Sequence, residues 1–199
     1  MSIFNLNIQN ESTDNKIVAG LERLSHVFKV LLWEKAKESG LSPIQIQILI
    51  FIQYHSAEKN TVSYLAKEFN ITKPTVSDAV KSLEQKKLAE KIIDTIDSRS
   101  FHLKITDKGK QIVKGAEDFT DPVSRILAGI SQTDKEIVWN SISTLITVLN
   151  RQDVISIQRS CSNCKHFEHK NEEYYCNLLR QPLHTSDLRI DCPEFTQAV

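Results

Sequence analysis

Four cysteines near the C-terminus are the residues of this sequence whose spacing most directly indicates chemistry. They are Cys161, Cys164, Cys176 and Cys192, and the 160 residues before them contain none. A Cys-x2-Cys pair converges two thiolates in a tight turn, and two further cysteines complete the tetrahedral set that structural Zn²⁺ prefers. Four sulfur ligands leave no open position for a substrate. The spacing therefore predicts a structural zinc site rather than a catalytic one.

The segment around these cysteines also has a physical need for a metal. Residues 156–199 contain few large apolar side chains. A segment of about 40 residues rarely folds on so small a core without a metal or a disulfide. We therefore expect residues 156–199 to form a small metal-bound module with four cysteine ligands, which follows a larger domain over residues 1–155.

Other chemistry remains open for the same cysteines. An iron–sulfur cluster also takes four cysteines, and Cys192 is followed by proline, as in ferredoxin motifs. Cys161 and Cys164 could instead act as redox-active thiols, whereas stable disulfides suit an intracellular protein poorly. Three nearby histidines could replace one cysteine as a ligand: His166, His169 and His184.

The elements ahead of the cysteines follow from hydrophobic periodicity and capping residues. Apolar residues at helical spacing, with caps and breakers between them, predict helices over 14–39, 42–52, 61–69 and 72–87. Alternating residues then predict two strands, 91–96 and 100–105. A further helix is expected from Thr106 towards Thr120, bent or split at Asp121-Pro122. A capping box of Thr133 and Glu136 is expected to open a last helix.

Two short helices followed by a hairpin form a winged helix-turn-helix, which can bind DNA. The fold class is therefore mostly α with a small β wing, and residues 56–106 form its DNA-binding part. The outward face of the second short helix is expected to meet the major groove with Lys73, Pro74, Thr75, Ser77, Asp78 and Lys81. Arg99, at the tip of the hairpin beside Asp97, is expected to enter the minor groove.

At this point the sequence resembles the MarR family of bacterial transcription regulators. The resemblance rests on Val62–Ala66, Ile71–Ser77, Leu83–Leu88 and Asp97–Gly109, above all on Asp-x-Arg followed by Leu-x-x-Thr-x-x-Gly. It covers about residues 14–150. One departure is Lys87, where the family often has glycine.

The resemblance implies how such a protein would act. It implies a homodimer, with helical dimerisation elements, on double-stranded DNA at a pseudo-palindromic operator. It also implies repression that is relieved by a small, often aromatic effector. The family would place the effector pocket near the first two helices, where His26, Trp33, Tyr54 and His55 are candidates. Trp139 is expected to pack in the dimer interface.

Composition and charge bound the function. The 25 basic and 25 acidic residues balance, yet residues 56–115 hold twelve basic and eight acidic ones, which permits contact with nucleic acid. We find neither a signal peptide nor an apolar stretch that could span a membrane, so a cytoplasmic protein is expected. No phosphate-binding loop or hydrolase motif occurs in the sequence, so an enzyme is not expected.

Two alternative functions remain at this stage. In one, the cysteine site is the sensor of a metal- or redox-responsive regulator. In the other, the winged fold binds another protein and never contacts DNA.

Overall fold

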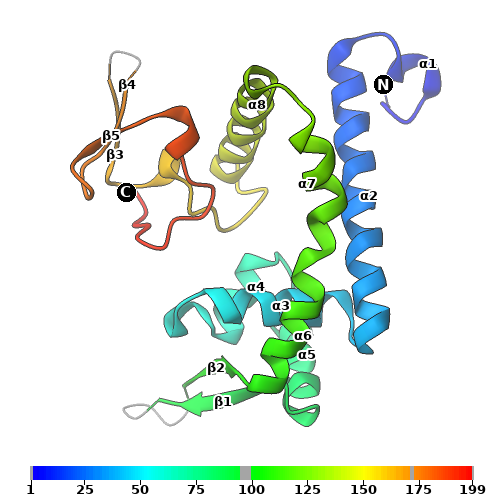
Figure 1. Cartoon of the computed structure of the whole chain (residues 1–199), viewed down its shortest axis with the longest axis vertical. Coiled ribbons are helices and arrows are strands. Elements are labelled where there is room, and N and C mark those ends of the chain that lie inside the picture. The colour runs from blue at the N-terminus through cyan, green and yellow to red at the C-terminus, as the bar shows by residue number, and fades with distance from the viewer. Residues whose placement is uncertain (1, 95–99, 171–172, 199) are drawn as a thin grey trace. The chain divides into compact units, whose positions relative to one another are not determined.

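The computed structural model describes residues 2–94, 100–170 and 173–198 (Figure 1). The chain groups into two compact units. One unit comprises Met1–Asn60 with Ser77–Ser124, and the other comprises Thr61–Val76 with Arg125–Val199. The boundary expected between residues 155 and 156 stays a prediction.

The described residues are mostly helical, with two small antiparallel sheets, as the sequence predicted for the helices and the wing. The α-helices are α1 (Leu6–Gln9), α2 (Thr13–Ser39), α3 (Pro43–Tyr54), α4 (Val62–Glu68), α5 (Lys73–Gln85), α6 (Asp107–Ala116), α7 (Asp121–Ala128) and α8 (Gln132–Arg151). The strands are β1 (Ala89–Ile93), β2 (Phe101–Ile105), β3 (Phe167–Lys170), β4 (Glu173–Cys176) and β5 (Gln181–Leu183).

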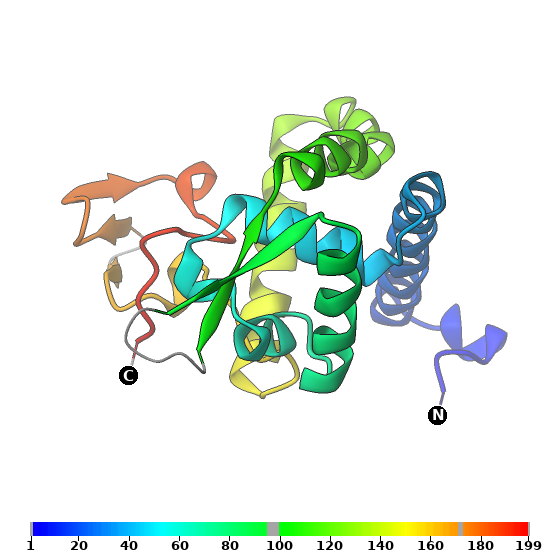
Figure 2. The same ribbon diagram turned by 90° about the horizontal axis from the view of Figure 1, so that it is seen from below.

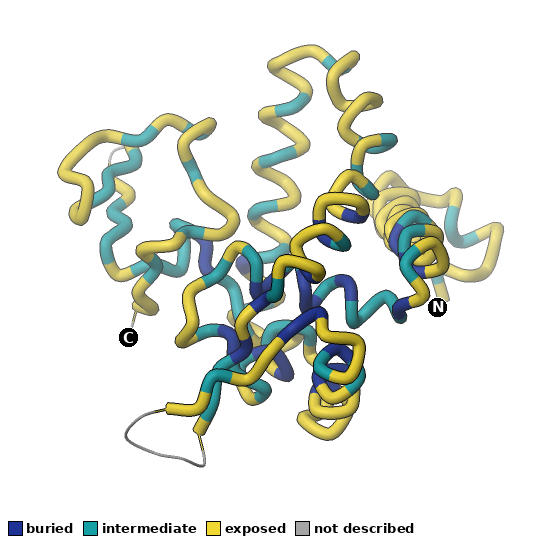
Figure 3. Tube along the Cα trace, turned by 60° about the horizontal axis from the view of Figure 1, so that its bottom comes forward, coloured by how far each residue is buried: buried dark blue, intermediate teal, exposed yellow. Residues whose placement is uncertain are grey.

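The long helix α2 is capped at both ends but buries little of its length. Ser12 Oγ accepts a hydrogen bond from the Asn15 backbone N–H at 3.1 Å. Gly40 ends the helix with φ of 64°, a left-handed conformation that favours glycine. Only Leu32 and Ala36 of α2 are buried, so Figure 3 shows long exposed stretches on this helix. Most of its apolar residues therefore remain available to a partner.

Helix α3 forms the centre of the first unit. Its Ile46, Ile48 and Leu49 are fully buried. The helix contacts α2, α6 and β2, from which Leu103 and Val113 add buried side chains. An apolar core of this kind holds the wing and α6 in place.

Helices α4 and α5 are the expected pair of short helices. Thr61 Oγ1 accepts a hydrogen bond from Tyr64 N at 3.2 Å and so caps α4. After α4, Asn70 adopts a left-handed conformation with φ of 49°. The Ile71 N–H then bonds back to the carbonyl of Ala66 at 3.0 Å. The chain thus reverses within a few residues before α5 begins.

The expected hairpin is present as β1 and β2. The strands pair antiparallel, with Ala89 opposite Ile105 and Ile93 opposite Phe101, and Figure 2 shows them side by side. The first strand begins two residues earlier than predicted. The tip of the hairpin, including Asp97 and Arg99, lies outside the described residues.

The turn from α5 into β1 explains the departure at Lys87. Lys87 has φ of 60°, in the left-handed region, where glycine meets no steric penalty and other residues do. Its N–H donates to the carbonyl of Glu84 at 2.8 Å, and Leu88 N donates to Leu83 O at 2.9 Å. These bonds hold a backbone shape that glycine would adopt with less strain.

The turn from β2 into α6 explains the spacing of the Leu-x-x-Thr-x-x-Gly motif. Leu103 is buried, and Thr106 Oγ1 accepts from Gly109 N at 3.1 Å while it donates to the carbonyl of Lys87 at 2.8 Å. A Cβ atom on Gly109 would lie 2.1 Å from the carbonyl oxygen of Leu88. Only glycine allows this close approach of the two backbones.

The later helices confirm one prediction and correct another. The helix that starts after Thr106 ends at Ala116, a 3₁₀ helix spans Glu117–Thr120, and α7 starts at Asp121. The expected split is confirmed, but the first part ends four residues before Thr120. The capping box of Thr133 and Glu136 is wrong. Helix α8 is capped by Ser131, whose backbone is extended and whose Oγ accepts from Asp134 N at 3.2 Å.

The tail contains a small sheet that the sequence did not predict. Its strand order is β3-β4-β5, all antiparallel. Phe167 lies opposite Cys176, and Tyr174 lies opposite Leu183. Short 3₁₀ helices at Cys161–Asn163 and Thr185–Asp187 flank the sheet.

A search of the described residues for membrane-spanning helices found none that is both long enough and apolar enough.

Candidate nucleic-acid interface and cysteine pocket

Helix α5 separates its side chains into a buried apolar face and an exposed polar face. Its apolar side chains Val76, Ala79, Val80 and Leu83 are buried. All of the predicted DNA-contacting residues on this helix are exposed: Lys73, Pro74, Thr75, Ser77, Asp78 and Lys81. The structure therefore leaves the predicted face free to meet a ligand.

The N-terminus of α5 is polar and carries short side chains. Thr72 Oγ1 accepts a hydrogen bond from Thr75 N at 3.3 Å and lies 2.8 Å from Thr75 Oγ1. The positive end of the helix dipole and nearby backbone N–H groups favour anions at such a position. With Lys73 beside it, this end of α5 has the chemistry of a phosphate contact.

Several lysines near the wing already contact the protein. Lys86 Nζ donates to Gly40 O at 2.6 Å, and Lys108 Nζ donates to Lys86 O at 3.1 Å. Lys104 Nζ lies 3.7 Å from a carboxylate oxygen of Glu90. Lys104 therefore pairs across the two strands of the wing, whereas Lys86 and Lys108 connect the turn after α5 to the end of α2 and to α6. Arg99 lies outside the described residues, and its contact with the minor groove stays a prediction.

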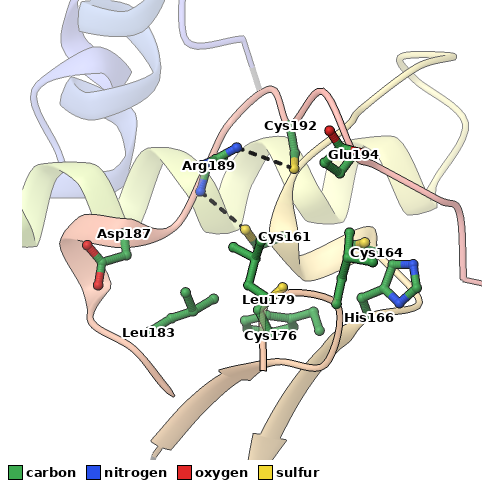
Figure 4. A pocket seen from close by; sticks show the side chains of 12 residues that line it. Cys161, Cys164, His166, Cys176, Leu179, Leu183, Asp187, Arg189, Cys192 and Glu194 are labelled. Atoms are coloured by element: carbon green, nitrogen blue, oxygen red, sulfur yellow. Dashed lines mark hydrogen bonds between the residues drawn. The ribbon is translucent and has the colours of Figure 1, made fainter. Parts of the chain in front are cut away.

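The four cysteines line one pocket in the tail. Figure 4 shows their sulfur atoms around a common space, together with His166 and Arg189. Cys161 comes from a 3₁₀ helix, Cys164 follows it, Cys176 ends β4, and Cys192 lies in the loop near the C-terminus. Each cysteine is free and half-buried. The structure thus brings together all four cysteines that the sequence analysis singled out.

Hydrogen bonds hold two of the sulfur atoms. Arg189 N donates to Cys161 Sγ at 3.3 Å, and Arg189 Nη1 donates to Cys192 Sγ at 3.9 Å. Burial raises the pKa of the Cys161 thiol, the Arg189 N–H opposes this effect, and the neighbouring cysteines add to it. A cation bound in the pocket would instead lower the pKa of the Cys161 thiol, because a nearby positive charge favours the thiolate.

The Cys-x2-Cys turn is anchored to α8. Cys164 N donates to Cys161 O at 2.9 Å, which closes the turn. Inside the turn, Ser162 Oγ lies 2.9 Å from Oγ1 of the buried Thr147, and Asn163 Nδ2 donates to Asn150 Oδ1 at 2.8 Å. Helix α8 therefore positions the first two sulfurs.

The side chains that line the pocket are of types that bind metal ions, but they are not already arranged as a coordination shell. Over the ranges 2–94, 100–170 and 173–198, no group of three or more His, Cys, Asp or Glu side chains is already arranged to hold a metal ion. The four thiols face one space, so a bound ion would have to draw them closer together. Of the three candidate histidines, His166 lines this pocket, whereas His169 packs against Tyr174 with ring centroids 4.7 Å apart. His184 instead precedes the 3₁₀ helix Thr185–Asp187.

Beside the pocket lies a buried ionic cluster that the sequence analysis missed. Arg159 is 6% exposed and binds Asp191, Glu68 and the hydroxyl of Tyr64. Burial acts to lower the pKa of Arg159, but hydrogen bonds to Asp191 and Glu68 outweigh it, so the pKa is raised. No local pattern could reveal this cluster, because Arg159 and Glu68 are 91 residues apart in the chain.

The four effector-pocket candidates occupy separate surroundings. His26 Nε2 lies 2.6 Å from Glu22 Oε1 on an exposed part of α2, where Trp33 is also exposed. Tyr54 donates a short hydrogen bond to Glu117, which raises its pKa. His55 stacks on Phe51 at 3.7 Å between ring centroids. Their role in effector binding stays a prediction.

A protein-family comparison finds a match that covers the helix-turn-helix and part of the wing. Residues 39–100 match the MarR family model. They include α3, α4, α5 and β1, with the polar face of α5 among them.

Two relatives match at the sequence level. One is an uncharacterized HTH-type transcriptional regulator, YwaE of Bacillus subtilis (strain 168), 32% identical over 75 residues, which are 37% of this chain and 44% of YwaE. The other is the HTH-type transcriptional regulator BilQ of Clostridioides difficile (strain CD3), 29% identical over 108 residues, 52% of this chain and 73% of BilQ. The chain thus spans less than half of YwaE. Both relatives are named as regulators and not as enzymes, in agreement with the sequence-based expectation.

Solved structures share the fold. The crystal structure of a complex of MepR from S. aureus with DNA has a TM-score of 0.58 to this chain, with 22% identity over 66% of this chain and 97% of MepR. A MepR mutant from a multidrug-resistant S. aureus clinical isolate gives a TM-score of 0.54, with 23% identity over 70% of this chain and 99% of the mutant. Residues 39–100 of this chain therefore match the MarR family, and the chain has the winged helix-turn-helix fold that MepR also has.

Proposed function

We propose that this chain is a sequence-specific, DNA-binding transcriptional regulator of the bacterial cytoplasm that acts as a homodimer. The observation that carries the proposal is the exposed polar face of α5, opposite a fully buried apolar face, in a segment that matches the MarR family. MepR, which shares the fold, has been crystallised with DNA. Helix α5 would read base edges in the major groove, while lysines and the helix N-terminus contact phosphates.

The homodimer is supported by apolar residues that the described chain leaves exposed. On α2 they include Ile17, Leu24 and Trp33, and on α8 they include Ile137 and Leu145. Apolar side chains gathered on an exposed surface mark an interaction site in a soluble protein. A second copy of the chain would cover these helices and place two α5 helices on a pseudo-palindromic operator.

We further propose that the regulator is a repressor that releases its operator when a small aromatic molecule binds. The aromatic and imidazole side chains on and just after α2 and α3, His26, Trp33, Tyr54 and His55, are the candidate contacts. The naming of both relatives as transcriptional regulators supports control of transcription. Whether the protein represses or activates is tested by transcription in vitro from a promoter that overlaps an operator selected from random duplex DNA.

The DNA-binding proposal is tested with operators selected from random duplex DNA. Fluorescence anisotropy then compares the wild type with the Lys73→Gln and Lys81→Gln variants over a range of salt concentrations. Each variant should weaken binding and reduce the slope of log affinity against log salt by about one. Lys114→Gln, an exposed position on α6, is the matched control and should retain the slope. Selection of no DNA, even at low salt, would favour a protein-binding role for the winged fold.

A second proposed property is a structural Zn²⁺ ion bound by Cys161, Cys164, Cys176 and Cys192. Support comes from the convergence of all four thiols on one pocket and from the donation of Arg189 to two of their sulfur atoms. Zn²⁺ would cross-link three segments of the tail that share little apolar core. The hydrogen bonds from α8 to the Cys-x2-Cys turn position two of the sulfur atoms, and Arg189 donates to the sulfur atoms of Cys161 and Cys192.

Elemental analysis and absorbance of protein purified anaerobically, without added metal, test this proposal. One zinc per chain in a colourless sample is the expected result. Iron with sulfide and visible absorbance would instead identify an iron–sulfur cluster, and metal-free protein with reactive thiols would identify a thiol sensor.

A further inference from the structure

A buried arginine joins the cysteine pocket to the first helix of the helix-turn-helix. Arg159 Nε and Nη2 donate to the two carboxylate oxygens of Asp191 at 2.6 and 2.7 Å. Its Nη1 and Nη2 donate to the two carboxylate oxygens of Glu68 at 2.6 and 3.1 Å. The guanidinium therefore binds two carboxylates at once, each in the bidentate geometry that gives strong and directional ion pairs.

One side of this cluster belongs to the cysteine pocket. Asp191 directly precedes Cys192, and Arg159 lies two residues before Cys161. The two segments are also joined through their backbones, because Cys192 N donates to Arg159 O at 3.0 Å and Cys161 N donates to Arg189 O at 3.1 Å. The positions of two sulfur atoms and of the Arg159–Asp191 pair are thus set by the same short stretches of backbone.

The other side of the cluster belongs to the helix-turn-helix. Glu68 is the last residue of α4, and Tyr64, one turn earlier, accepts a hydrogen bond from Arg159 Nη1 at 3.0 Å. Just before Arg159, the N–H and hydroxyl of Ser156 donate to Asn70 Oδ1 at 3.1 and 2.8 Å. Asn70 is the left-handed residue of the turn that leads into α5. The segment 156–159 therefore holds both α4 and its turn.

We propose that Arg159 is a positioning residue through which metal occupancy of the cysteine pocket controls the helix-turn-helix. With a metal on Cys161 and Cys192, the two backbone segments that hold Arg159 and Asp191 are fixed, and Glu68 and the turn stay in place. Without the metal, those segments are free to move. A buried guanidinium must keep its carboxylate partners, so a shift of Arg159 and Asp191 carries Glu68 with it and loosens the C-terminal end of α4.

This inference rests on the proposed zinc site and, for its effect on DNA, also on the proposed DNA-binding function. The cysteine pocket becomes the sensing site of a regulator whose output is the stability of α4. Coupling free energies of this kind change affinity by about 5- to 150-fold. The expected response is a reduced affinity for DNA in the metal-free protein.

Hydrogen exchange on the full-length protein tests the coupling without DNA. Exchange of the backbone amides of residues 61–72 is measured by mass spectrometry, with one equivalent of Zn²⁺ and with a zinc chelator. Removal of Zn²⁺ should speed exchange in this segment at least about fivefold. Unchanged exchange on release of bound Zn²⁺, or the absence of bound Zn²⁺ in protein purified anaerobically, would overturn the proposal.

Variants separate coupling from simple stability. Glu68→Gln keeps the size of the side chain but weakens its ion pair, so exchange of residues 61–72 should lose most of its dependence on Zn²⁺ while zinc content is retained. Glu58→Gln, an exposed acidic residue outside the cluster, is the matched control and should respond as the wild type does. A Glu68→Gln protein with the full zinc response would overturn the role of Arg159. Because Glu68→Gln retains the buried arginine and Asp191, it should fold even where Arg159 variants do not.

Binding to the selected operator, with Zn²⁺ and with chelator, then distinguishes the two proposals. An exchange response without any DNA binding would contradict the proposed function and leave the coupling intact. DNA binding that is unaffected by chelation, together with unchanged exchange, would contradict the coupling and leave the proposed function intact.

Discussion

The winged segment, residues 43–116 from α3 to α6, and the cysteine tail, residues 156–199, are stabilised by different interactions. In the winged segment, fully buried apolar side chains such as Ile46, Leu49 and Leu103 come from several elements. In the described part of residues 156–199, the buried residues are Arg159 and Ser160, and both are polar. The winged segment has the usual basis of a stable fold, because burial of apolar area favours folding without any ligand.

The difference indicates where the molecule can respond to its surroundings. A fold held by apolar burial changes little when a metal is added or removed, except where, as proposed, α4 and its turn are joined to the tail through Arg159. If a metal binds the four cysteines, as proposed, the tail depends on what occupies the space between their thiols. We therefore expect metal removal and cysteine substitution to destabilise the tail first. Substitutions at glycine or turn positions in the winged segment should leave the zinc content of the tail unchanged.

The largest expected effect is that of Cys176→Ser. Loss of one of the four proposed ligands should lower zinc affinity by more than about 100-fold. That is the upper end of the loss typical when a residue that only hydrogen-bonds to a metal ligand is removed. The tail should then become sensitive to limited proteolysis, while the winged segment outside residues 61–72 stays resistant. Ser186→Ala, an exposed position in the same tail, is the control. A Cys176→Ser tail as resistant as the wild type would show that the thiols do not stabilise it.

Arg159→Met should have the next largest effect. It leaves Glu68 and Asp191 without their shared cation, which should cost up to about 3 kcal/mol, below the range for a fully buried pair because the side chains of Glu68 and Asp191 are 18% and 40% exposed. Chemical denaturation followed by the fluorescence of Trp139, in a Trp33→Phe background, measures this loss. Arg151→Met, at the exposed end of α8, should change stability by much less. Equal effects of the two substitutions would mean that the buried cluster adds no stability.

Two glycines of α6 offer a matched pair in the winged segment. Gly109→Ala should destabilise it by about 1–3 kcal/mol, because the new methyl group would overlap the carbonyl of Leu88 and the backbone would have to move. Gly115→Ala has nothing within 4 Å of its new methyl group and should stabilise the helix by up to about 1 kcal/mol. Trp33 fluorescence in a Trp139→Phe background reports both. Zinc content should not change in either variant, and a loss of zinc on Gly109→Ala would break the comparison between the two regions.

The smallest expected effect is that of Lys87→Gly. Because Lys87 is left-handed, glycine should relieve strain and stabilise the winged segment by about 0.5–1 kcal/mol, after its greater flexibility in the unfolded chain is subtracted. The same substitution at Lys114, inside α6, should be destabilising by a similar amount. Thermal unfolding of the two variants measures the difference, and equal destabilisation by both would contradict the role of the left-handed turn.

The sequence predicted the winged segment well because its signals are local. Periodic apolar residues and caps such as Thr61 and Thr106 mark helices wherever they occur, and the structure confirms them. The error at α8 has a local cause too. Ser131 and Thr133 are both capable caps, and the choice between them depends on the backbone at Ser131, which is extended.

The grouping of the four cysteines could be predicted from the sequence, but the small sheet of the tail could not, and the metal chemistry stays a prediction. The four cysteines stood out by their type and spacing, and the structure brings them to one pocket. The strands β3 to β5 are too short to show a period. The pairing of Arg159 with Glu68 depends on segments far apart in sequence. Contacts between segments that are far apart in the chain leave no local pattern, so they cannot be predicted from a single sequence.

The exposed apolar residues of α2 and α8 have a consequence for gene expression. If they are covered by a second copy, as proposed, folding and association are linked by mass action. At low abundance the amount of dimer rises with the square of the amount of chain. A change in expression of the regulator would then alter operator occupancy more than proportionally, and dilution of the chain by cell growth without new synthesis would itself weaken control.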